Sequence, residues 1–514
     1  MTHVRLDQVV RRHIGSVDGG GRAALSTRNG DVTFLDLEER AVLTARRLRA
    51  AGLQRGDRLL ILMNNRVEWF DLLFACAKLG VVMVPANNFS VGEELTYIVE
   101  DAGASLVVSD PDLSPALDFL LGHEVLGSRL VLVGGERAGW TAIDEIDPGA
   151  VDPADVDEEV APDDPFLLQY TSGTTGTPKA AVHTQSTLMY NTLLMVHEYA
   201  LTEDDVYLLM VAMCWVAGFH FLTLATLLVG GRVAMYPDVN RIKPEELVRA
   251  WAKDRVTLGA VVPTLLRRLI DGGHLSSEMA GTLRLMITGS EPVPVDLLRA
   301  VHQALPRCEV VQSYGMSEAP ASVLRLRGAD AVARVGSVGR PSLLCEVRIL
   351  DASGSVVSPG QVGEIVFRSP HTAQGYWNRP EQTAAAFRDG WFHSGDLATV
   401  DEDGFVFIVG RSKDMIISGG INIYPAEVER VLNGHPGVRE AVVFGVPDPD
   451  WGETPVAVVV PDGEVSQEEL AAYAAERLSK FKVPKRWHFR DAAFPRTASG
   501  KLQKFRVRDA IVDG

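Results

Sequence analysis

Residues 170–179 of the chain read Tyr-Thr-Ser-Gly-Thr-Thr-Gly-Thr-Pro-Lys, a short segment crowded with hydroxyls and glycines. Glycines let a backbone approach an anion and adopt positive φ, while hydroxyls and main-chain N–H groups donate to phosphate oxygens. The terminal lysine adds a positive charge. The segment therefore predicts a loop that binds a polyphosphate through Thr171, Ser172, Gly173, Thr174, Thr175 and Lys179.

The same composition is also that of a solvated linker, which is the ordinary reading of Ser, Thr and Gly runs. The flanks favour a loop inside a domain, because residues 163–170 read as a turn followed by a strand and residues 180–182 are apolar again. The loop is not a Walker A motif, since Lys179 follows Pro178 and lacks the Gly-Lys-Ser/Thr order that opens a helix.

Helical and extended segments alternate outward from this loop. Thr33 is placed to cap a helix that ends at Gly52, and residues 58–63 read as a strand. The pattern continues with a helix over 72–79, a strand over 81–84, a helix over 93–102 and a strand over 105–108, and resumes at 256–262, 283–287 and 310–314. The fold class is therefore α/β, with parallel sheets in a large, multi-layered N-terminal domain of two α/β subdomains.

The pattern changes after residue 338. Short alternating strands at 346–350 and 363–367, separated by turns, predict a small β-barrel-like subdomain. A charged, turn-prone stretch then leads to a helix over 425–432 and a strand over 440–445. We therefore expect a large domain of residues 1–410 and a small, mobile α+β C-terminal domain of residues 411–514.

Length and charge limit the functions that the chain can have. A chain of 514 residues exceeds the size of one core, so at least two domains are expected. The net charge of −17 argues against nucleic acid or an anionic membrane as a partner, because both would repel an acidic surface.

The four cysteines show neither metal-ligand spacing nor a disulfide framework, and they predict buried thiols in a reducing cytoplasm: Cys76, Cys214, Cys308 and Cys345. No apolar signal segment follows Met1. Residues 208–229 are long and uncharged enough to span a bilayer, but Gly218, His220 and the glycines that follow favour a buried helix plus strand.

Four further clusters lie downstream of the loop. They read Tyr-Gly-Met-Ser-Glu at 314–318, Ser-Gly-Asp at 394–396, Gly-Arg-Ser-Lys-Asp at 410–414 and Pro-Arg-Thr-Ala-Ser-Gly-Lys at 495–501. Each alone has a plain structural reading as a turn, a linker or a solvated tail. Together and in this order they resemble the adenylate-forming superfamily, which comprises acyl-CoA synthetases, non-ribosomal peptide adenylation domains and firefly-type luciferases. The resemblance covers essentially the whole chain.

The resemblance implies that the loop is the phosphate loop of an ATP site, with Ala180 in place of the usual final glycine. It implies that Tyr314 stacks on adenine and that Gln312 meets the exocyclic amine of adenine. Ser317 then supplies a hydroxyl to the α-phosphate, and Glu318 is similar to the ligand of Mg²⁺. The segment that lies along the adenine face and its neighbours would be Gly289, Ser290, Glu291, Gln312, Ser313, Tyr314, Gly315 and Met316, with Asp396 and Arg411 on the ribose.

The resemblance also assigns two half-reactions to two arrangements of the small domain. Lys501 would bridge the acid and the phosphate in the first, and rotation about a hinge at Lys413 would replace it with a thiol tunnel in the second. Charge neutralisation by Glu318-bound Mg²⁺ and Lys501 suits a reaction between two anions. The residues that face CoA would be Gly419, Gly420, Phe481 and Lys485.

By the same resemblance, the acyl pocket is lined by Met213, Cys214, Trp215, Gly218, Phe219 and Val262, together with Gly289, Ser290 and Met316. Several relatives place histidine in this segment where the chain has Cys214 and Trp215. No acidic side chain is present there to pair with a substrate ammonium, which argues against an α-amino acid. We therefore expect an apolar, bulky acid, although Trp215 has an equal structural reading as core packing.

The resemblance therefore implies an ATP- and Mg²⁺-dependent acid–thiol ligase that makes an acyl-adenylate, releases pyrophosphate and acylates CoA. Three alternatives stay open: transfer to the phosphopantetheine of a carrier protein, a luciferase-like oxygenase, and a non-catalytic nucleotide-binding protein. The acid and the oligomeric state stay open as well.

Overall fold

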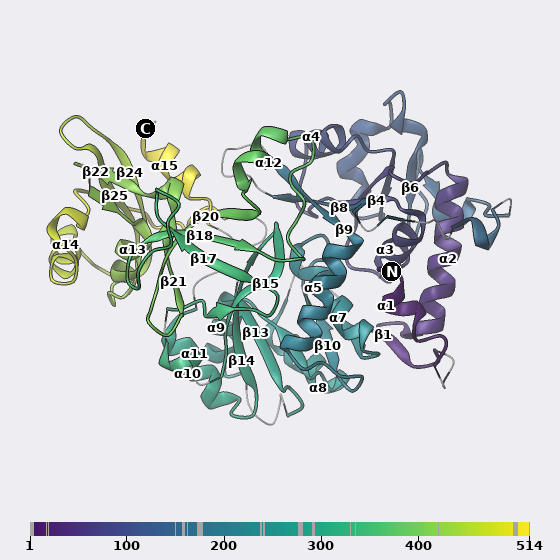
Figure 1. The fold of residues 1–514 in the computed structure, drawn as a ribbon, viewed down its shortest axis with the longest axis horizontal. Helices are drawn as coiled ribbons and strands as arrows, with labels where there is room; N and C mark the ends of the chain where they lie inside the picture. The colour runs from purple at the N-terminus through teal and green to yellow at the C-terminus, as the bar shows by residue number, and fades with distance from the viewer. Residues whose placement is uncertain are drawn as a thin grey trace. The chain divides into compact units, whose positions relative to one another are not determined.

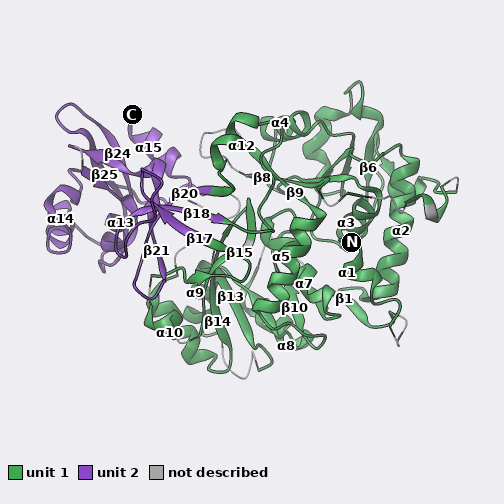
Figure 2. Cartoon of the chain, in the orientation of Figure 1, with its two compact units in different colours: residues 1–346, 368–392 green, residues 347–367, 393–514 purple. Residues whose placement is uncertain are grey.

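The computed structural model describes residues 5–16, 18, 20–149, 151–156, 160–161, 163–171, 178–236, 239, 242–275, 281–289, 293–328, 330–334, 336–419, 421–496 and 502–512. Figure 1 shows the chain as a ribbon and labels many of its helices and strands. Two compact units are present (Figure 2): unit 1 comprises Met1–Glu346 and Arg368–Phe392, and unit 2 comprises Val347–Phe367 and His393–Gly514.

The first sheet of unit 1 has seven strands. Thr33 caps helix α2 (Phe34–Ala50) through a capping box with Asp36, as its position predicts. The strand order is β7-β6-β5-β3-β4-β8-β9, and every pair is parallel except β8–β9. The elements are β3 (Arg58–Leu62), α3 (Glu68–Leu79), β4 (Val82–Pro85), α4 (Glu93–Ala102), β5 (Leu106–Ser109), β6 (Leu130–Leu132), β7 (Thr141–Ala142), β8 (Pro165–Thr171) and β9 (Lys179–Thr184).

The second sheet of unit 1 has nine strands in the order β16-β15-β14-β13-β12-β10-β11-β1-β2. Its inner pairs are parallel, and both edges are antiparallel. The strands are β1 (Ala23–Thr27), β2 (Gly30–Thr33), β10 (Val206–Leu209), β11 (Arg232–Met235), β12 (Leu258–Ala260), β13 (Leu285–Gly289), β14 (Glu309–Met316), β15 (Ala319–Leu326) and β16 (Arg340–Pro341). The helices of unit 1 are α1 (Gln8–Arg11), α5 (Gln185–Glu198), α6 (Val216–Phe219), α7 (Leu222–Leu228), α8 (Pro244–Asp254), α9 (Pro263–Asp271), α10 (Val295–Ala304), α11 (Asp330–Ala333) and α12 (Pro380–Ala386), besides α2, α3 and α4.

The chain then forms two smaller sheets. The first has the order β17-β18-β20-β19, with β21 also paired to β20, and the β19–β20 and β20–β21 pairs are antiparallel. The second has the order β23-β22-β25-β24, with β26 paired to β25. The strands are β17 (Glu346–Leu350), β18 (Gly363–Arg368), β19 (Phe387–Arg388), β20 (Trp391–Val400), β21 (Val406–Arg411), β22 (Ile416–Ser418), β23 (Ile421–Ile423), β24 (Val438–Asp448), β25 (Gly452–Pro461) and β26 (Arg486–Phe489).

Successive side chains of β24 and β25 point to opposite faces of the second small sheet, and apolar residues lie on both faces. Val443 packs with residues of α13 (Pro425–Asn433) and α14 (Gln467–Ala475) on one face. Val442 and Phe444 pack with Val507 of α15 (Lys504–Val512) on the other. Helices on both faces of a mainly antiparallel sheet make this an α+β domain.

The predicted α/β fold class with a smaller α+β part is confirmed. All four cysteines are buried and unpaired, as predicted. Within residues 208–229 the chain forms the end of β10 followed by the short helices α6 and α7. Across the described ranges, no helix has the length and apolarity needed to cross a membrane. The domain boundary after residue 410 stays a prediction, since the compact units divide the chain at other positions.

Candidate active site

The structure describes the base of the predicted phosphate loop. Thr171 at the end of β8 and Lys179 at the start of β9 face each other in an antiparallel pair, and the Thr171 hydroxyl donates to the Lys179 carbonyl at 3.2 Å. The predicted phosphate-binding residues in between lie outside the described residues: Ser172, Gly173, Thr174 and Thr175. The β8–β9 pair thus places Lys179 directly after the predicted loop.

Lys179 belongs to a three-residue array that includes the predicted metal ligand. Its Nζ lies 3.6 Å from the ring centroid of Tyr376, and the Tyr376 hydroxyl donates to Glu318 Oε1 at 2.6 Å. Glu318 is only 9% exposed. Burial lowers the pKa of Lys179, and the nearby Glu318 carboxylate opposes that shift. An ammonium and a carboxylate are therefore both held by one tyrosine at the base of the loop.

Ser317 and Glu318 form the two-residue turn between β14 and β15, because Met316 pairs directly with Ala319. Contacts to both of its backbone carbonyls hold this turn in place. Ala373 N–H donates to the Glu318 carbonyl at 2.7 Å, and His183 Nε2 lies 2.7 Å from the Ser317 carbonyl. Only a protonated Nε2 can donate there, which sets the tautomer of His183.

His183 is one of three buried histidines under this turn. Its ring packs edge-on against His220 with centroids 5.8 Å apart, and it lies close enough to buried His371 to help lower the pKa of that residue. Burial lowers the pKa of His183 to about 4 and that of His371 to about 3, and it lowers the pKa of His220 well below the ordinary value. All three are therefore neutral at pH 7.

We expect acid to destabilise the protein through these histidines. In the unfolded chain His183 takes up a proton below pH 6.5, whereas in the folded protein it stays neutral down to about pH 4. This difference stabilises the fold above pH 6.5, and the stabilisation is lost as the pH falls toward 4. The full loss is about 3 kcal/mol for His183.

Urea denaturation from pH 7.5 to 4.5 measures the free energy of unfolding over this range. His183→Gln, whose amide can also donate to Ser317, should flatten the curve, whereas exposed His197→Gln should not; equal slopes for all three proteins would contradict the prediction.

The predicted adenine segment lies on two adjacent strands. Gly289 ends β13 in register with Ser313 of β14, and a Cβ at Gly289 would lie 2.4 Å from the Ser313 carbonyl oxygen, so no larger residue fits there. The Gln312 side-chain nitrogen is buried without a hydrogen-bond partner among the described residues, which leaves an amide available to a ligand. Tyr314, Gly315 and Met316 follow on the same strand. Ser290 and Glu291 lie outside the described residues.

The two predicted ribose contacts in unit 2 are a cross-strand pair. Asp396 of β20 stands opposite Arg411 of β21, and the guanidinium Nε lies 3.0 Å from the carboxylate Oδ1. Asp396 is 5% exposed, whereas the Arg411 side chain is half exposed. The pair presents an acceptor and a donor side by side, which suits a vicinal diol.

The predicted hinge residue Lys413 lies in a single turn (Ser412–Asp414) directly after β21. Burial lowers the pKa of its ammonium. Lys501 lies outside the described residues, but its flanks are described: Arg496 and Leu502 form an isolated antiparallel bridge, and Gln503 N–H donates to the Pro495 carbonyl at 2.9 Å.

Two of the predicted CoA-facing residues, Gly419 and Lys485, lie beside Trp451, a tryptophan that sequence reasoning missed. Gly419 has φ of +58°, and a Cβ there would lie 2.7 Å from the Trp451 ring. Lys485 Nζ lies 4.5 Å from the centroid of that ring, and Trp451 is 51% exposed. Phe481 is exposed at 39%, and Gly420 lies outside the described residues. An exposed tryptophan in the Asp-Pro-Asp-Trp-Gly turn at 448–452 was the available signal.

The predicted acyl segment is held by an amide side chain. Asn65 accepts from Met213 N–H and donates to the Val211 carbonyl, each at 2.8 Å. Met213, Cys214 and Phe219 are buried, Trp215 and Gly218 lie at and within α6, and Val262 caps α9 at 43% exposure. Which of these residues line an acyl pocket stays a prediction.

A second set of contacts that the sequence did not reveal holds the residues at both ends of the predicted phosphate loop. Asp101 of α4 accepts from the Tyr170 hydroxyl at 2.7 Å and from Arg379 at 2.5 Å. Arg379 also donates to the Tyr97 hydroxyl at 2.7 Å, which in turn donates to the Pro178 carbonyl at 2.9 Å. Tyr170 precedes the loop and Pro178 closes it, so one buried carboxylate organises both ends.

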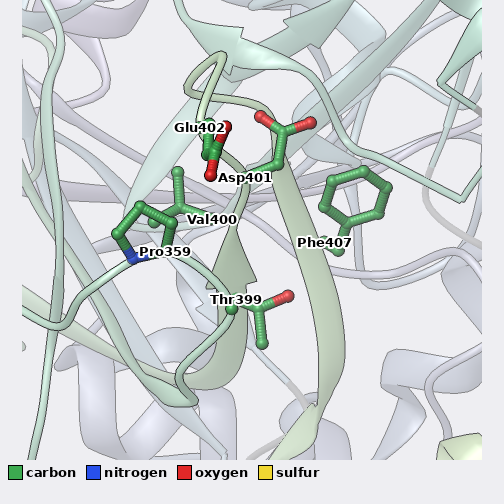
Figure 3. Close-up of a pocket in the computed structure, with 7 residues that line it drawn as sticks. Pro359, Thr399, Val400, Asp401, Glu402 and Phe407 are labelled. Atoms are coloured by element: carbon green, nitrogen blue, oxygen red, sulfur yellow. The ribbon is translucent and has the colours of Figure 1, made fainter.

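Within the described ranges, no three His, Cys, Asp or Glu side chains gather in a way that could hold a metal ion. A single buried carboxylate such as Glu318 nevertheless fits Mg²⁺, which is usually bound by one or two carboxylates plus substrate phosphates. An open hollow of about 350 Å³ (Figure 3) lies in unit 2 between Pro359, Thr399, Val400, Glu402 and Phe407. It contains none of the predicted site residues, and its two carboxylates, Asp401 and Glu402, do not suit an anionic substrate.

The chain is similar to known proteins both in sequence and in fold. Residues 16–377 match the family model of the AMP-binding enzyme, and residues 427–501 match that of the AMP-binding enzyme C-terminal domain. The chain is 41% identical over 500 residues to a feruloyl-CoA synthase of Amycolatopsis sp, covering 96% of both chains. It is 36% identical over 498 residues to a 2-succinylbenzoate–CoA ligase of Geobacillus kaustophilus, covering 95% of both. The crystal structure of ATP-bound MatB from Rhodopseudomonas palustris superimposes with a TM-score of 0.87 at 31% identity, covering 99% of both chains.

Proposed function

The chain belongs to the AMP-binding enzyme family, and from this we infer that it is an AMP-forming acid–thiol ligase of the acyl-CoA synthetase type. It activates a carboxylic acid with ATP to an acyl-adenylate, releases pyrophosphate and transfers the acyl group to the thiol of CoA. In the structure, the Lys179–Tyr376–Glu318 array at the base of the predicted phosphate loop supports this inference.

The first half-reaction joins two anions, so the protein must orient them and neutralise their charge. Lys179 offers a half-buried ammonium beside the loop, where low solvation strengthens its attraction for phosphate. Glu318 would hold Mg²⁺, which when bound supplies charge neutralisation on the phosphate oxygens. Asp396 and Arg411 bind the ribose hydroxyls, and Lys501 bridges the substrate carboxylate and the α-phosphate.

The second half-reaction uses the surface of unit 2 around Trp451. Its exposed indole offers a stacking face, and the Lys485 ammonium over it offers a charge for a CoA phosphate. Gly419 leaves space beside that ring because it has no side chain. This grouping supports CoA as the acceptor, and two CoA ligases among the relatives support it independently.

The acid is proposed to be apolar and aromatic. Feruloyl and 2-succinylbenzoyl groups, which name two relatives, both carry a ring. The segment from Met213 to Phe219 contains no charged side chain, so it suits a ring better than an amino acid. The four buried, unpaired thiols support a reducing, cytoplasmic setting.

The test is pyrophosphate release from ATP across a panel of aliphatic, alicyclic, aromatic and amino acids, each with and without CoA. Release with aromatic acids that CoA stimulates supports the proposal. Release that is indifferent to CoA would favour a carrier protein as the acceptor. Silence with every acid, in a protein that still binds ATP, would count against the ligase assignment.

A further inference from the structure

Residues 373–379, called here the strap, connect the phosphate loop to the turn that carries Glu318. The strap pairs with β9 through the backbone: Gln374 N–H donates to Val182 O, Val182 N–H to Gly375 O, and Trp377 N–H to Ala180 O, each at 2.9 Å. Ala373 N–H then donates to the Glu318 carbonyl at 2.7 Å. The strap is thus hydrogen-bonded to both halves of the phosphate site.

Tyr376 is the strap residue whose side chain points into that site. It is buried, and its backbone N–H donates to Thr383 Oγ1 at 2.9 Å. Its ring packs edge-on against Phe387 with centroids 5.8 Å apart. These contacts fix the ring from behind, so the face toward Lys179 and the hydroxyl toward Glu318 are set before any ligand binds.

We propose that Tyr376 is a positioning residue for magnesium–ATP: its hydroxyl fixes one oxygen of the Glu318 carboxylate for the metal, and its ring holds the Lys179 ammonium for the phosphate. This inference rests on the function proposed above and adds a residue that none of the predicted motifs contains. An ammonium and a carboxylate this close attract each other strongly in a poorly solvated site. A phenol satisfies both partners and keeps each available to the ligand.

Two substitutions separate the two contacts. Tyr376→Phe removes only the hydroxyl and keeps the ring under Lys179, whereas Tyr376→Leu removes both. Tyr207→Phe is the matched control, because Tyr207 is also buried and its hydroxyl has no hydrogen-bond partner among the described residues. ATP binding is measured by titration calorimetry over a series of Mg²⁺ concentrations and in EDTA, without acid or CoA.

For Tyr376→Phe we expect the Mg²⁺ concentration that half-saturates the effect on ATP binding to rise about tenfold, the order of one charge-assisted hydrogen bond. ATP binding in EDTA should be unchanged in Tyr376→Phe and weaker in Tyr376→Leu. In a Glu318→Gln background, Tyr376→Phe should have no further effect on the Mg²⁺ response. A purely structural role would lower the melting temperature of Tyr376→Phe without this dependence on Glu318.

A wild-type Mg²⁺ response in folded Tyr376→Phe, with the wild type itself binding ATP, overturns this inference and leaves the proposed function standing. A wild type that binds no ATP with or without Mg²⁺ overturns both. If Tyr376→Leu fails to fold, Tyr376→Phe and the Glu318→Gln background decide alone.

Discussion

Replacing Lys501 with alanine is expected to abolish acyl-adenylate formation while sparing the second half-reaction. Pyrophosphate release from ATP and acid should fall by at least about a hundredfold, the scale seen when one preorganised charge-stabilising donor is removed. Transfer to CoA from supplied acyl-adenylate should be close to wild type, because the second step needs no bridge between a carboxylate and a phosphate.

The reason for this asymmetry is electrostatic. An acid and ATP repel each other, and an ammonium that touches both lowers the cost of their approach. Lys501 lies between Arg496 and Leu502 in the sequence, and these two residues pair in an isolated antiparallel bridge. We expect the substitution to leave this bridge and α15 intact, so the loss reports chemistry and not folding.

Lys253→Ala is the charge-matched control, since Lys253 is an exposed residue of α8. It should retain both half-reactions. Survival of both half-reactions in Lys501→Ala would show that the role of Lys501 is wrong. Loss of both, with an unchanged melting temperature, would show that Lys501 also acts in thiol transfer.

Gly419→Leu should have the opposite effect: acyl-adenylate forms normally and CoA transfer fails. Gly419 has a left-handed backbone, and any Cβ there meets the Trp451 ring at 2.7 Å. A leucine would therefore displace the indole and fill the space beside it. A displacement of about 1 Å can cost a hundredfold in rate, so we expect CoA transfer to fall by about that factor or more.

The control must carry the same backbone strain without the collision. Gly328 has φ of +59°, and a Cβ there would meet nothing within 4 Å, so Gly328→Leu strains the backbone in open space. It should keep CoA transfer. Separate assays of pyrophosphate release and thioester formation measure both variants. Unimpaired CoA transfer in Gly419→Leu would remove Gly419 and Trp451 from the proposed CoA surface.

Local signals predicted the elements well. Thr33 and Gly52 bracket a helix in the sequence, and α2 lies between them with a capping box. Gly103 ends α4 in a left-handed conformation, one residue after the predicted last residue of that helix. Such features depend on neighbours within a few positions, so the sequence records them directly.

Contacts between distant residues were beyond sequence reasoning. Tyr376 and Glu318 are 58 positions apart, and neither spacing nor composition indicates that a tyrosine hydroxyl meets that carboxylate. The contacts of Asp101 could not be predicted either, because an acidic residue at the end of a helix usually faces water. The Asp396–Arg411 pair is the exception: both residues were named by family resemblance, and β20 and β21 bring them opposite each other.

The strap also matters for protein engineering by recombination of homologous enzymes. A crossover between residues 319 and 372 would take Tyr376 and Arg379 from one parent and Glu318, Lys179 and Asp101 from the other. Parents that differ at any of these positions would then yield chimeras with mismatched partners, even though each segment is intact. Crossovers beyond residue 392 would inherit the strap together with its partners, and libraries cut there should contain more active members.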